Sequence, residues 1–397
     1  LRLTSGLYPL PGTSNARLTV VGGSGEIVLG STGGAINSAP FNTDVAFSNV
    51  ASVVGITFRD YSTVIAWPTS CPWRVAANAT VSLWGTNMLG AGDVALTNFS
   101  VFVLSRNVFS EQAAIRVQGT NLTVSMKPCV VDSYGSWGGI PATITNDISL
   151  EGVNATAAFP DNADFYLQGF ITGTGTVAKT GSARTEILEP SDFVGNVSCG
   201  DTGTLIFDAA TAGNSNNAVT VGPSATFALY PAGVGTSDTA AWIKTLHGSG
   251  TGGKVFIPAR QTLTVDTLDG AVSVQGVGST SVLRVLNLAT NATLNVLANT
   301  SVVLDSIGSG AAVVLTNDTA TLAVAGAGQT LDSLTLTSGR VAVSGAFTVA
   351  NLSGAGTLVK NDAGTLTVNF SVLAGGVAAN AGTVKLSNSN TGDLLGT

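Results

Sequence analysis

Charged residues are scarce in this chain. Asp, Glu, Lys and Arg make up 10% of its 397 residues, whereas an ordinary soluble domain carries roughly a quarter. The net charge of −7 at pH 7 comes from scattered acids. Because no run of Lys or Arg is present to neutralise phosphates, we expect no nucleic-acid partner.

Histidine and cysteine are also rare, which limits metal and redox chemistry. His247 is the only histidine, so a site built from several imidazoles is excluded within one chain, and we expect neither a metal nor a cofactor. We expect His247 to be an ordinary surface residue rather than a catalytic base. Of the three cysteines, Cys71 and Cys129 are the candidate disulfide, with Cys199 buried or bonded to another chain; three buried thiols are the alternative.

Long hydrophobic runs are missing as well. Apolar stretches such as residues 311–315 end after a few residues, far short of the roughly 18 to 20 that cross a bilayer as a helix. We therefore expect no membrane span. The chain opens at Leu1 without a basic segment followed by an apolar core, so we expect any secretory signal to have been removed.

Glycine, alanine, serine, threonine, valine and asparagine fill the chain, a composition typical of β-structure. From about Lys254 to Leu386, short β-type runs follow one another at roughly ten-residue spacing. Tandem β-sandwich domains could contain such strands, but strands this similar favour a right-handed parallel β-helix, a solenoid. We expect an irregular, Trp-containing part or separate β domain over residues 1–165 and a regular repeat region over residues 166–397.

One segment occurs twice. Ile171 to Lys179 reads ITGTGTVAK, and about 180 residues later Leu352 to Lys360 reads LSGAGTLVK. Each copy leads to a similar closing phrase, DTGTLIF ending at Phe207 and NAGTVKL ending at Leu386. Self-similarity of this kind is typical of repeat proteins, in which each unit buries its apolar face only by stacking on its neighbours.

The repeated segment resembles the autotransporter-associated β-strand repeat of bacterial passenger domains, which implies a parallel β-helix. The matching positions of the second copy are Gly356, Thr357, Leu358 and Lys360, then Gly364, Thr365, Leu366 and Val368, then Ala381, Gly382, Thr383 and Val384. The first copy matches at Gly175, Thr176, Val177 and Lys179, and again at Gly203, Thr204 and Leu205. Its middle strand is replaced by ARTEILEP.

Asparagines in the Asn-x-Ser/Thr context are the second signal, and they predict N-glycosylation. Glycans would cover a surface that has little charge to keep it soluble. The ten candidates are Asn78, Asn98, Asn121, Asn154, Asn196, Asn291, Asn299, Asn317, Asn351 and Asn369.

Other motifs give weaker signals. Residues 248–254 read GSGTGGK, which has the glycine and lysine spacing of a phosphate-binding loop, but Val255 follows where Ser or Thr would hold magnesium, so we expect a turn. The carboxylate groups that could cleave a polysaccharide are Asp161 with Asp164, and Asp192 with Glu186 and Glu189. The tryptophans that could stack on sugars, with core packing as the alternative, are Trp67, Trp73 and Trp84.

The sequence thus predicts an extracellular structural glycoprotein without catalytic activity, located at the cell surface and forming a rod or filament. Its expected partners are further copies of the same chain, joined head to tail, and covalent glycans. An adhesin or passenger-like module that binds glycans or cells is the alternative, and a polysaccharide-active β-helix enzyme is the third possibility.

Overall fold

The computed structural model describes residues 148–387, with gaps at 151–154, 160–163, 168, 188–192, 201, 209–215, 231–238 and 278–280. Before residue 148 it gives the strands by their backbone. The chain divides into two compact units, residues 1–198 with 203–206, and residues 199–202 with 207–397. The sequence-based division at residue 165 stays a prediction, and the candidate disulfide partners Cys71 and Cys129 lie outside the described side chains.

All regular structure in the described part of the chain is β-strand. The first unit contains β1 (Arg2–Leu3), β2 (Ala16–Val20), β3 (Gly25–Leu29), β4 (Thr43–Phe47), β5 (Val54–Asp60), β6 (Trp73–Val75), β7 (Ala79–Trp84), β8 (Val94–Leu96), β9 (Val101–Ser105), β10 (Val108–Phe109), β11 (Ile115–Val117), β12 (Thr123–Lys127), β13 (Ala142–Ile144), β14 (Ile148–Leu150), β15 (Thr156–Phe159), β16 (Phe165–Leu167), β17 (Ile171–Gly173), β18 (Thr176–Lys179) and β19 (Arg184–Ile187).

Two strands contribute residues to both units, β20 (Asn196–Cys199) and β21 (Thr204–Asp208). The second unit continues with β22 (Ala218–Val221), β23 (Thr226–Tyr230), β24 (Thr239–Ile257), β25 (Gln261–Gly276), β26 (Ser281–Leu288), β27 (Thr293–Val296), β28 (Thr300–Leu304), β29 (Ala312–Leu315), β30 (Thr321–Val324), β31 (Gln329–Leu336), β32 (Arg340–Ser344), β33 (Phe347–Gly354), β34 (Thr357–Lys360), β35 (Thr365–Leu373), β36 (Val377–Ala379) and β37 (Thr383–Leu386).

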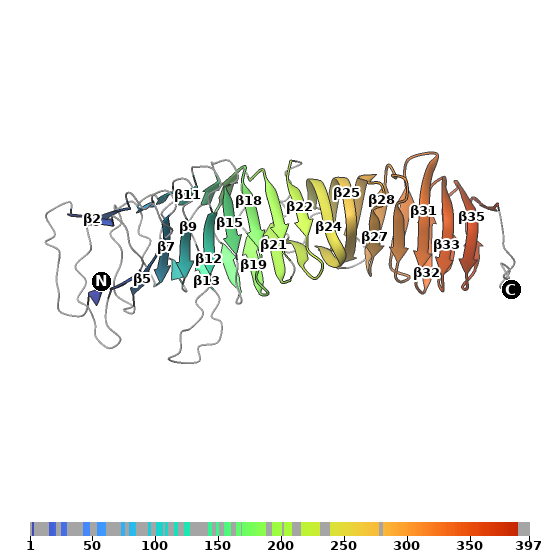
Figure 1. The fold of residues 1–397 in the computed structure, drawn as a ribbon. Helices are drawn as coiled ribbons and strands as arrows, with labels where there is room; N and C mark the ends of the chain where they lie inside the picture. Colours follow the sequence, from blue (N-terminus) through green and yellow to red (C-terminus); the bar gives the residue numbers. More distant parts are fainter. Residues whose placement is uncertain are drawn as a thin grey trace. The chain divides into compact units, whose positions relative to one another are not determined.

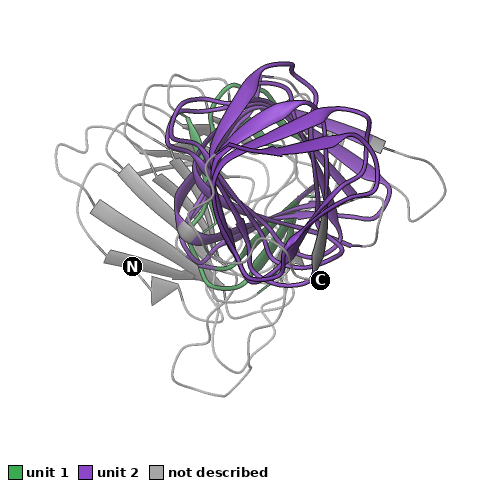
Figure 2. Ribbon diagram, turned by 90° about the vertical axis from the view of Figure 1, so that its right-hand side faces the viewer, with its two compact units in different colours: residues 1–198, 203–206 green, residues 199–202, 207–397 purple. Residues whose placement is uncertain are grey.

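The strands of the second unit form successive turns of a parallel solenoid. Ser301 of β28 pairs in parallel with Thr321 of β30, and Thr321 pairs in parallel with Ala342 of β32, so one turn takes about 20 residues. Two strands per turn account for the ten-residue spacing in the sequence. Figure 1 shows these strands side by side, and in Figure 2 the purple turns overlie one another around one axis.

The predicted fold class is confirmed: the protein is all-β and a parallel β-helix. Every pairing among the described strands is parallel, including those of β2 with β4 and of β35 with β37. A β-sandwich is built from antiparallel sheets. The alternative of tandem β-sandwich domains is therefore wrong.

The core consists of columns of apolar side chains, one from each turn. Leu283, Val302, Leu322 and Val343 lie in one such column, each aligned with the next in the strand register, and all four are buried. Burial alternates along many of the strands, as in the B-i-B-i-B pattern of β28. Each buried Leu or Val contributes about 1.5 to 3 kcal/mol, and it does so only because the adjacent turns cover it.

The corners of the second unit use a recurrent turn. Asn291 and Gly310 have positive φ, of 58° and 72°, and a small buried alanine follows each of them, Ala292 and Ala311. The amide of each alanine closes the turn by donating to the carbonyl three residues earlier, Ala289 or Gly308. Asparagine and glycine suit these positions because both tolerate the left-handed conformation.

The two copies of the repeated segment have the same local structure. Gly173 and Gly354 both have positive φ, 96° and 116°. A Cβ atom at Gly173 would lie 2.1 Å from the carbonyl oxygen of Leu150, and one at Gly354 would lie 2.0 Å from that of Leu336. The repetition therefore reflects a corner of the solenoid. At this corner the backbone adopts the left-handed conformation in close contact with the backbone of the preceding turn.

We expect Gly354→Ala to destabilise the protein by about 3 kcal/mol, because it adds a backbone clash to left-handed strain. Gly376→Ala is the matched control. Gly376 also has positive φ, 85°, but apart from its chain neighbours no atom lies within 4 Å of the position that a Cβ atom would take there. Its cost should be about 1 kcal/mol. Urea unfolding measures both, and equal costs would show that the close approach to Leu336 does not matter.

Candidate functional surfaces

Both copies of the repeated segment end in a completely buried lysine. The Nζ atom of Lys179 donates to the carbonyl oxygen of Gly181 at 2.5 Å. The Nζ atom of Lys360 donates to the carbonyl oxygen of Asp362 at 3.1 Å and forms an ion pair with the Asp362 carboxylate. In both places a buried ammonium thus binds the turn that follows its own strand.

The glycine of each closing phrase covers this turn from the next turn of the solenoid. Gly203 and Gly382 have positive φ, 85° and 75°. A Cβ atom at Gly203 would lie 2.4 Å from the Gly181 carbonyl oxygen, and one at Gly382 would lie 2.2 Å from the Asp362 carbonyl oxygen. The lysine and the distant glycine therefore form one structural unit, which explains why both parts of the motif occur twice.

Burial lowers the pKa of Lys360 below its ordinary value of 10.5, because the ammonium loses its hydration. Between the lowered pKa and 10.5 the unfolded chain binds more protons than the folded chain. The free energy of unfolding therefore rises with pH over this range.

We expect Lys360→Met to abolish this rise, because methionine keeps the apolar stem and has no titratable group. Urea unfolding at pH 7 and at pH 10 measures the difference. Lys385→Met is the control, since Lys385 is an exposed lysine of β37 and its replacement should leave the rise intact. The explanation fails if Lys360→Met retains the pH dependence of the unaltered protein.

Of the five candidate catalytic carboxylates, the structure describes Asp164 and Glu186, while Asp161, Glu189 and Asp192 lie outside the described residues. Arg184 binds both described carboxylates. Its backbone N–H donates to Asp164 Oδ1 at 3.2 Å, and its guanidinium forms an ion pair with the buried carboxylate of Glu186. This arrangement stabilises the adjoining strands β16 and β19, whose Tyr166 and Glu186 are paired in register.

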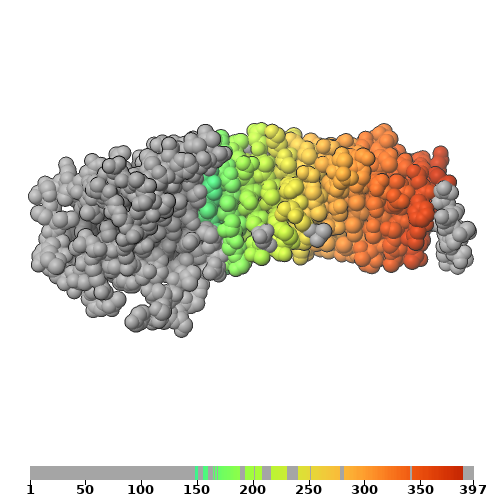
Figure 3. All heavy atoms as spheres, in the orientation of Figure 1, coloured from blue at the N-terminus to red at the C-terminus, as the bar shows by residue number. Residues whose placement is uncertain are grey.

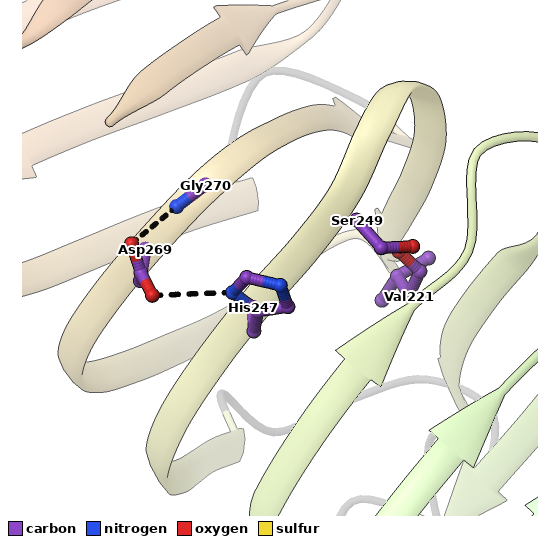
Figure 4. A network of polar contacts seen from close by, with 5 residues as sticks. All are labelled: Val221, His247, Ser249, Asp269 and Gly270. Atoms are coloured by element: carbon purple, nitrogen blue, oxygen red, sulfur yellow. Dashed lines mark hydrogen bonds and ion pairs between the residues drawn. The ribbon is translucent and has the colours of Figure 1, made fainter. Parts of the chain in front are cut away.

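His247 lies in a small polar network on β24 and β25 (Figure 4). Its Nδ1 atom is 3.2 Å from Asp269 Oδ2, and both side chains are exposed. Ser249, two residues further on, points away from the imidazole and donates its hydroxyl to the carbonyl of Val221 at 3.3 Å. The three residue types of a hydrolytic triad are thus close in the fold, but the serine does not hydrogen-bond to the imidazole.

The glycine-rich segment 248–254 is not the simple turn that its sequence predicts. It lies inside β24, where the pairing with β25 shifts register between Ser249 and Lys254. Its glycines allow the backbone to approach the previous turn closely: a Cβ atom at Gly252 would lie 2.1 Å from the Pro223 carbonyl oxygen. The glycines therefore serve close packing, and no helix N-terminus is present here to bind a phosphate.

Trp242 is the aromatic residue that sequence reasoning missed. Its side chain is 44% exposed on β24, and its Nε1–H donates to Asp266 Oδ1 at 2.6 Å. Arg284 follows two turns along the same row, where it pairs with Asp305 at 2.8 Å. The alternation of β24 was the available signal, because Trp242 stands between the inward-facing Ala241 and Ile243.

The tryptophans that the sequence singled out, Trp67, Trp73 and Trp84, have no described side chains. Cys199 is buried, and its thiol donates to the carbonyl of Thr226 at 3.4 Å. Among the described residues, no group of three or more His, Cys, Asp and Glu could hold a metal ion. Nor do those residues include a helix long and apolar enough to cross a membrane.

Six of the ten candidate glycosylation sites lie in the described part of the chain, and none of the six is buried. Asn78, Asn98, Asn121 and Asn154 lie outside it. The exposed sites are Asn196, Asn291, Asn351 and Asn369, and the half-buried sites are Asn299 and Asn317. The Asn317 side chain accepts a hydrogen bond of 2.7 Å from the Thr319 hydroxyl of its own sequon. Glycosylation at all ten stays a prediction.

The fold defines the class of this protein as a parallel β-solenoid. Comparison with family models, with curated proteins and with solved structures finds no match. The similarity to the autotransporter-associated repeat therefore rests on the residues of the two copies alone.

Proposed function

We propose that this chain is an extracellular structural glycoprotein without catalytic activity, a subunit of a surface rod or filament in which copies associate head to tail. The observation that carries the proposal is the continuity of the apolar columns, such as Leu283, Val302, Leu322 and Val343. Each turn offers the next turn backbone groups for parallel pairing and one apolar side chain that extends the column. A turn supplied by another copy can extend such a ladder, and a contact of this kind that does not close forms a fibre.

The surface of the second unit suits a glycosylated rod. Its outward rows consist largely of small uncharged residues that hydrogen-bond from turn to turn, as Thr321 does to Ser301 at 3.0 Å and Asn295 to Ser273 at 3.4 Å. On the face drawn in Figure 3 the described turns of the second unit lie against one another without a marked hollow. Glycans on the exposed asparagines would supply the hydration that so few charges provide.

We expect the natively isolated protein to form continuous fibres and to carry sugars on several of the ten sequon asparagines. Cryo-electron microscopy shows the fibres, and mass spectrometry of glycopeptides gives the occupancy of each site. Discrete particles with unmodified asparagines would contradict the proposal. Fibres with unmodified asparagines would support the proposed filament and contradict the proposed glycosylation.

Trp242 favours a second function, the binding of glycans by an adhesin. An indole held in place by Asp266 and 44% exposed presents a flat apolar face on which a sugar ring can stack. The hydroxyl of Thr264, Trp242's partner in the next turn, could reach the sugar's own hydroxyl groups.

If this second function holds, Trp242→Ala should reduce binding on a glycan array about fivefold, since stacking on an aromatic ring contributes on the order of 1 kcal/mol. Trp242→Phe is the control that keeps an aromatic face and should retain part of the binding. Equal binding by the unaltered protein and by Trp242→Ala would exclude this surface.

A further inference from the structure

Two exposed planar side chains lie in one outward row of the second unit, Trp242 of β24 and Arg284 of β26. Trp242 pairs with Thr264 of the next turn, and Thr264 pairs with Arg284 of the turn after that. Neighbouring strands lie about 4.8 Å apart, so the two backbone positions are about 9.6 Å apart along the row. The indole is 44% exposed and the Arg284 side chain 51% exposed. The half-buried Thr264 stands between them.

A carboxylate of the following turn holds each of these two side chains. Trp242 donates from Nε1 to Asp266 Oδ1 at 2.6 Å. Arg284 donates to Asp305 Oδ2 from Nε at 3.0 Å and from Nη2 at 2.8 Å. In both cases the acceptor lies two residues beyond the position that faces the donor. A ligand that binds the indole and the guanidinium therefore finds both groups already oriented, which reduces the entropy lost on binding.

Among the described residues, the exposed charged side chains beside Trp242 are positive. Lys244 is exposed and follows Trp242 by two residues on β24, so it extends from the same side of the strand about 6.7 Å away. Arg284 is the second positive group. The carboxylates of Asp266 and Asp305 are half-buried and already accept the bonds just described. Within the described structure, no acceptor engages Lys244 or the Nη1 group of Arg284, so these donors are available to an anionic ligand.

The row loses these features further along the ladder. Arg284 pairs with Val303, and Val303 pairs with Ala323, which pairs with Ser344. These three residues are small and uncharged. The aromatic and positive groups are therefore confined to the turns formed by β24, β25 and β26, a length that suits a few sugar units of a longer chain.

We propose that this row binds an acidic glycan, one that carries carboxylate or sulfate groups. One sugar ring stacks on Trp242, and an anionic group further along the glycan binds Arg284. The flat apolar face of an indole suits the first contact, and the paired N–H donors of a guanidinium suit the second. Lys244 adds positive charge beside the stacked sugar. This inference rests on the second function proposed above and names the class of glycan.

Calorimetric titration of the full chain tests the class of glycan. The probes are oligogalacturonate, its carboxyl-reduced neutral counterpart, and dextran sulfate. We expect at least one acidic probe to bind about tenfold or more tightly than the neutral probe, because only the acidic probes can pair with Arg284. The preference should decrease as the salt concentration is raised. Comparison of the two acidic probes distinguishes carboxylate from sulfate.

Substitution of Arg284 tests the anion-binding group. Arg284→Gln combined with Asp305→Asn removes the ion pair as a whole, so no unpaired carboxylate remains to repel the ligand. We expect this double variant to bind the acidic probe about tenfold more weakly and the neutral probe unchanged. Urea unfolding shows that the variant is folded.

Lys254→Gln is the matched control for the loss of one positive charge from the same region. Lys254 is an exposed lysine of β24, but it lies beyond the glycine-rich segment at which the pairing of this strand shifts, and its partner is Ser273. It should bind the acidic probe like the unaltered protein.

The outcomes separate this inference from the second function. If the neutral and acidic probes bind equally and Trp242→Ala weakens both, glycan binding stands and the acidic class is wrong. If the double variant binds the acidic probe like the unaltered protein, or if Lys254→Gln weakens binding as much, the assignment to Arg284 is wrong. If none of the three probes binds, the inference is wrong, and a glycan array without any bound glycan excludes the second function as well.

Discussion

The hydrogen-bonded pairing of each turn with the next is the constraint on which the rest of the structure depends. Parallel strands lie about 4.8 Å apart, so a corner of one turn must pass almost in contact with the backbone of the turn before it. That spacing explains the glycines at positions such as 173, 354 and 252, where a Cβ atom would meet a carbonyl oxygen at 2.0 to 2.1 Å. It also explains the buried lysines, which bind carbonyl groups at corners where the chain leaves its strand.

The same spacing accounts for the scarcity of charge. Every outward residue has a neighbour above and below at about 4.8 Å, so a repeated charge would face its own kind along the whole row. Thr, Ser and Asn avoid this repulsion and can hydrogen-bond along the row. Where charges do occur in the described residues they are often paired, as in Arg284 with Asp305 and Arg184 with Glu186.

Two places in the second unit depart from this pattern of small, uncharged outward residues. Trp242 is a large aromatic residue in a row that continues with Thr264 and Arg284, and Asp266 holds its indole in place. In β35, Phe370 and Val372 stand where the previous turn has Asn351 and Ser353. Both departures expose apolar side chains, with Trp242 44% exposed and Phe370 and Val372 38% and 62% exposed. Both lie in the second unit, and neither conflicts with a structural role for the columns beneath them.

The sequence by itself determined the β class and the parallel stacking, because a β-type composition and the repetition of short, similar strands can be read from local pattern. The ten-residue spacing and the double occurrence of the Gly-Thr motif were enough to predict a parallel β-helix. Burial of Lys360 and the pairing of Arg184 with Glu186 were decided only in three dimensions. Both features depend on which residue of the adjacent turn lies opposite. This register is set by the number of residues in each corner, and the local sequence pattern does not give that number.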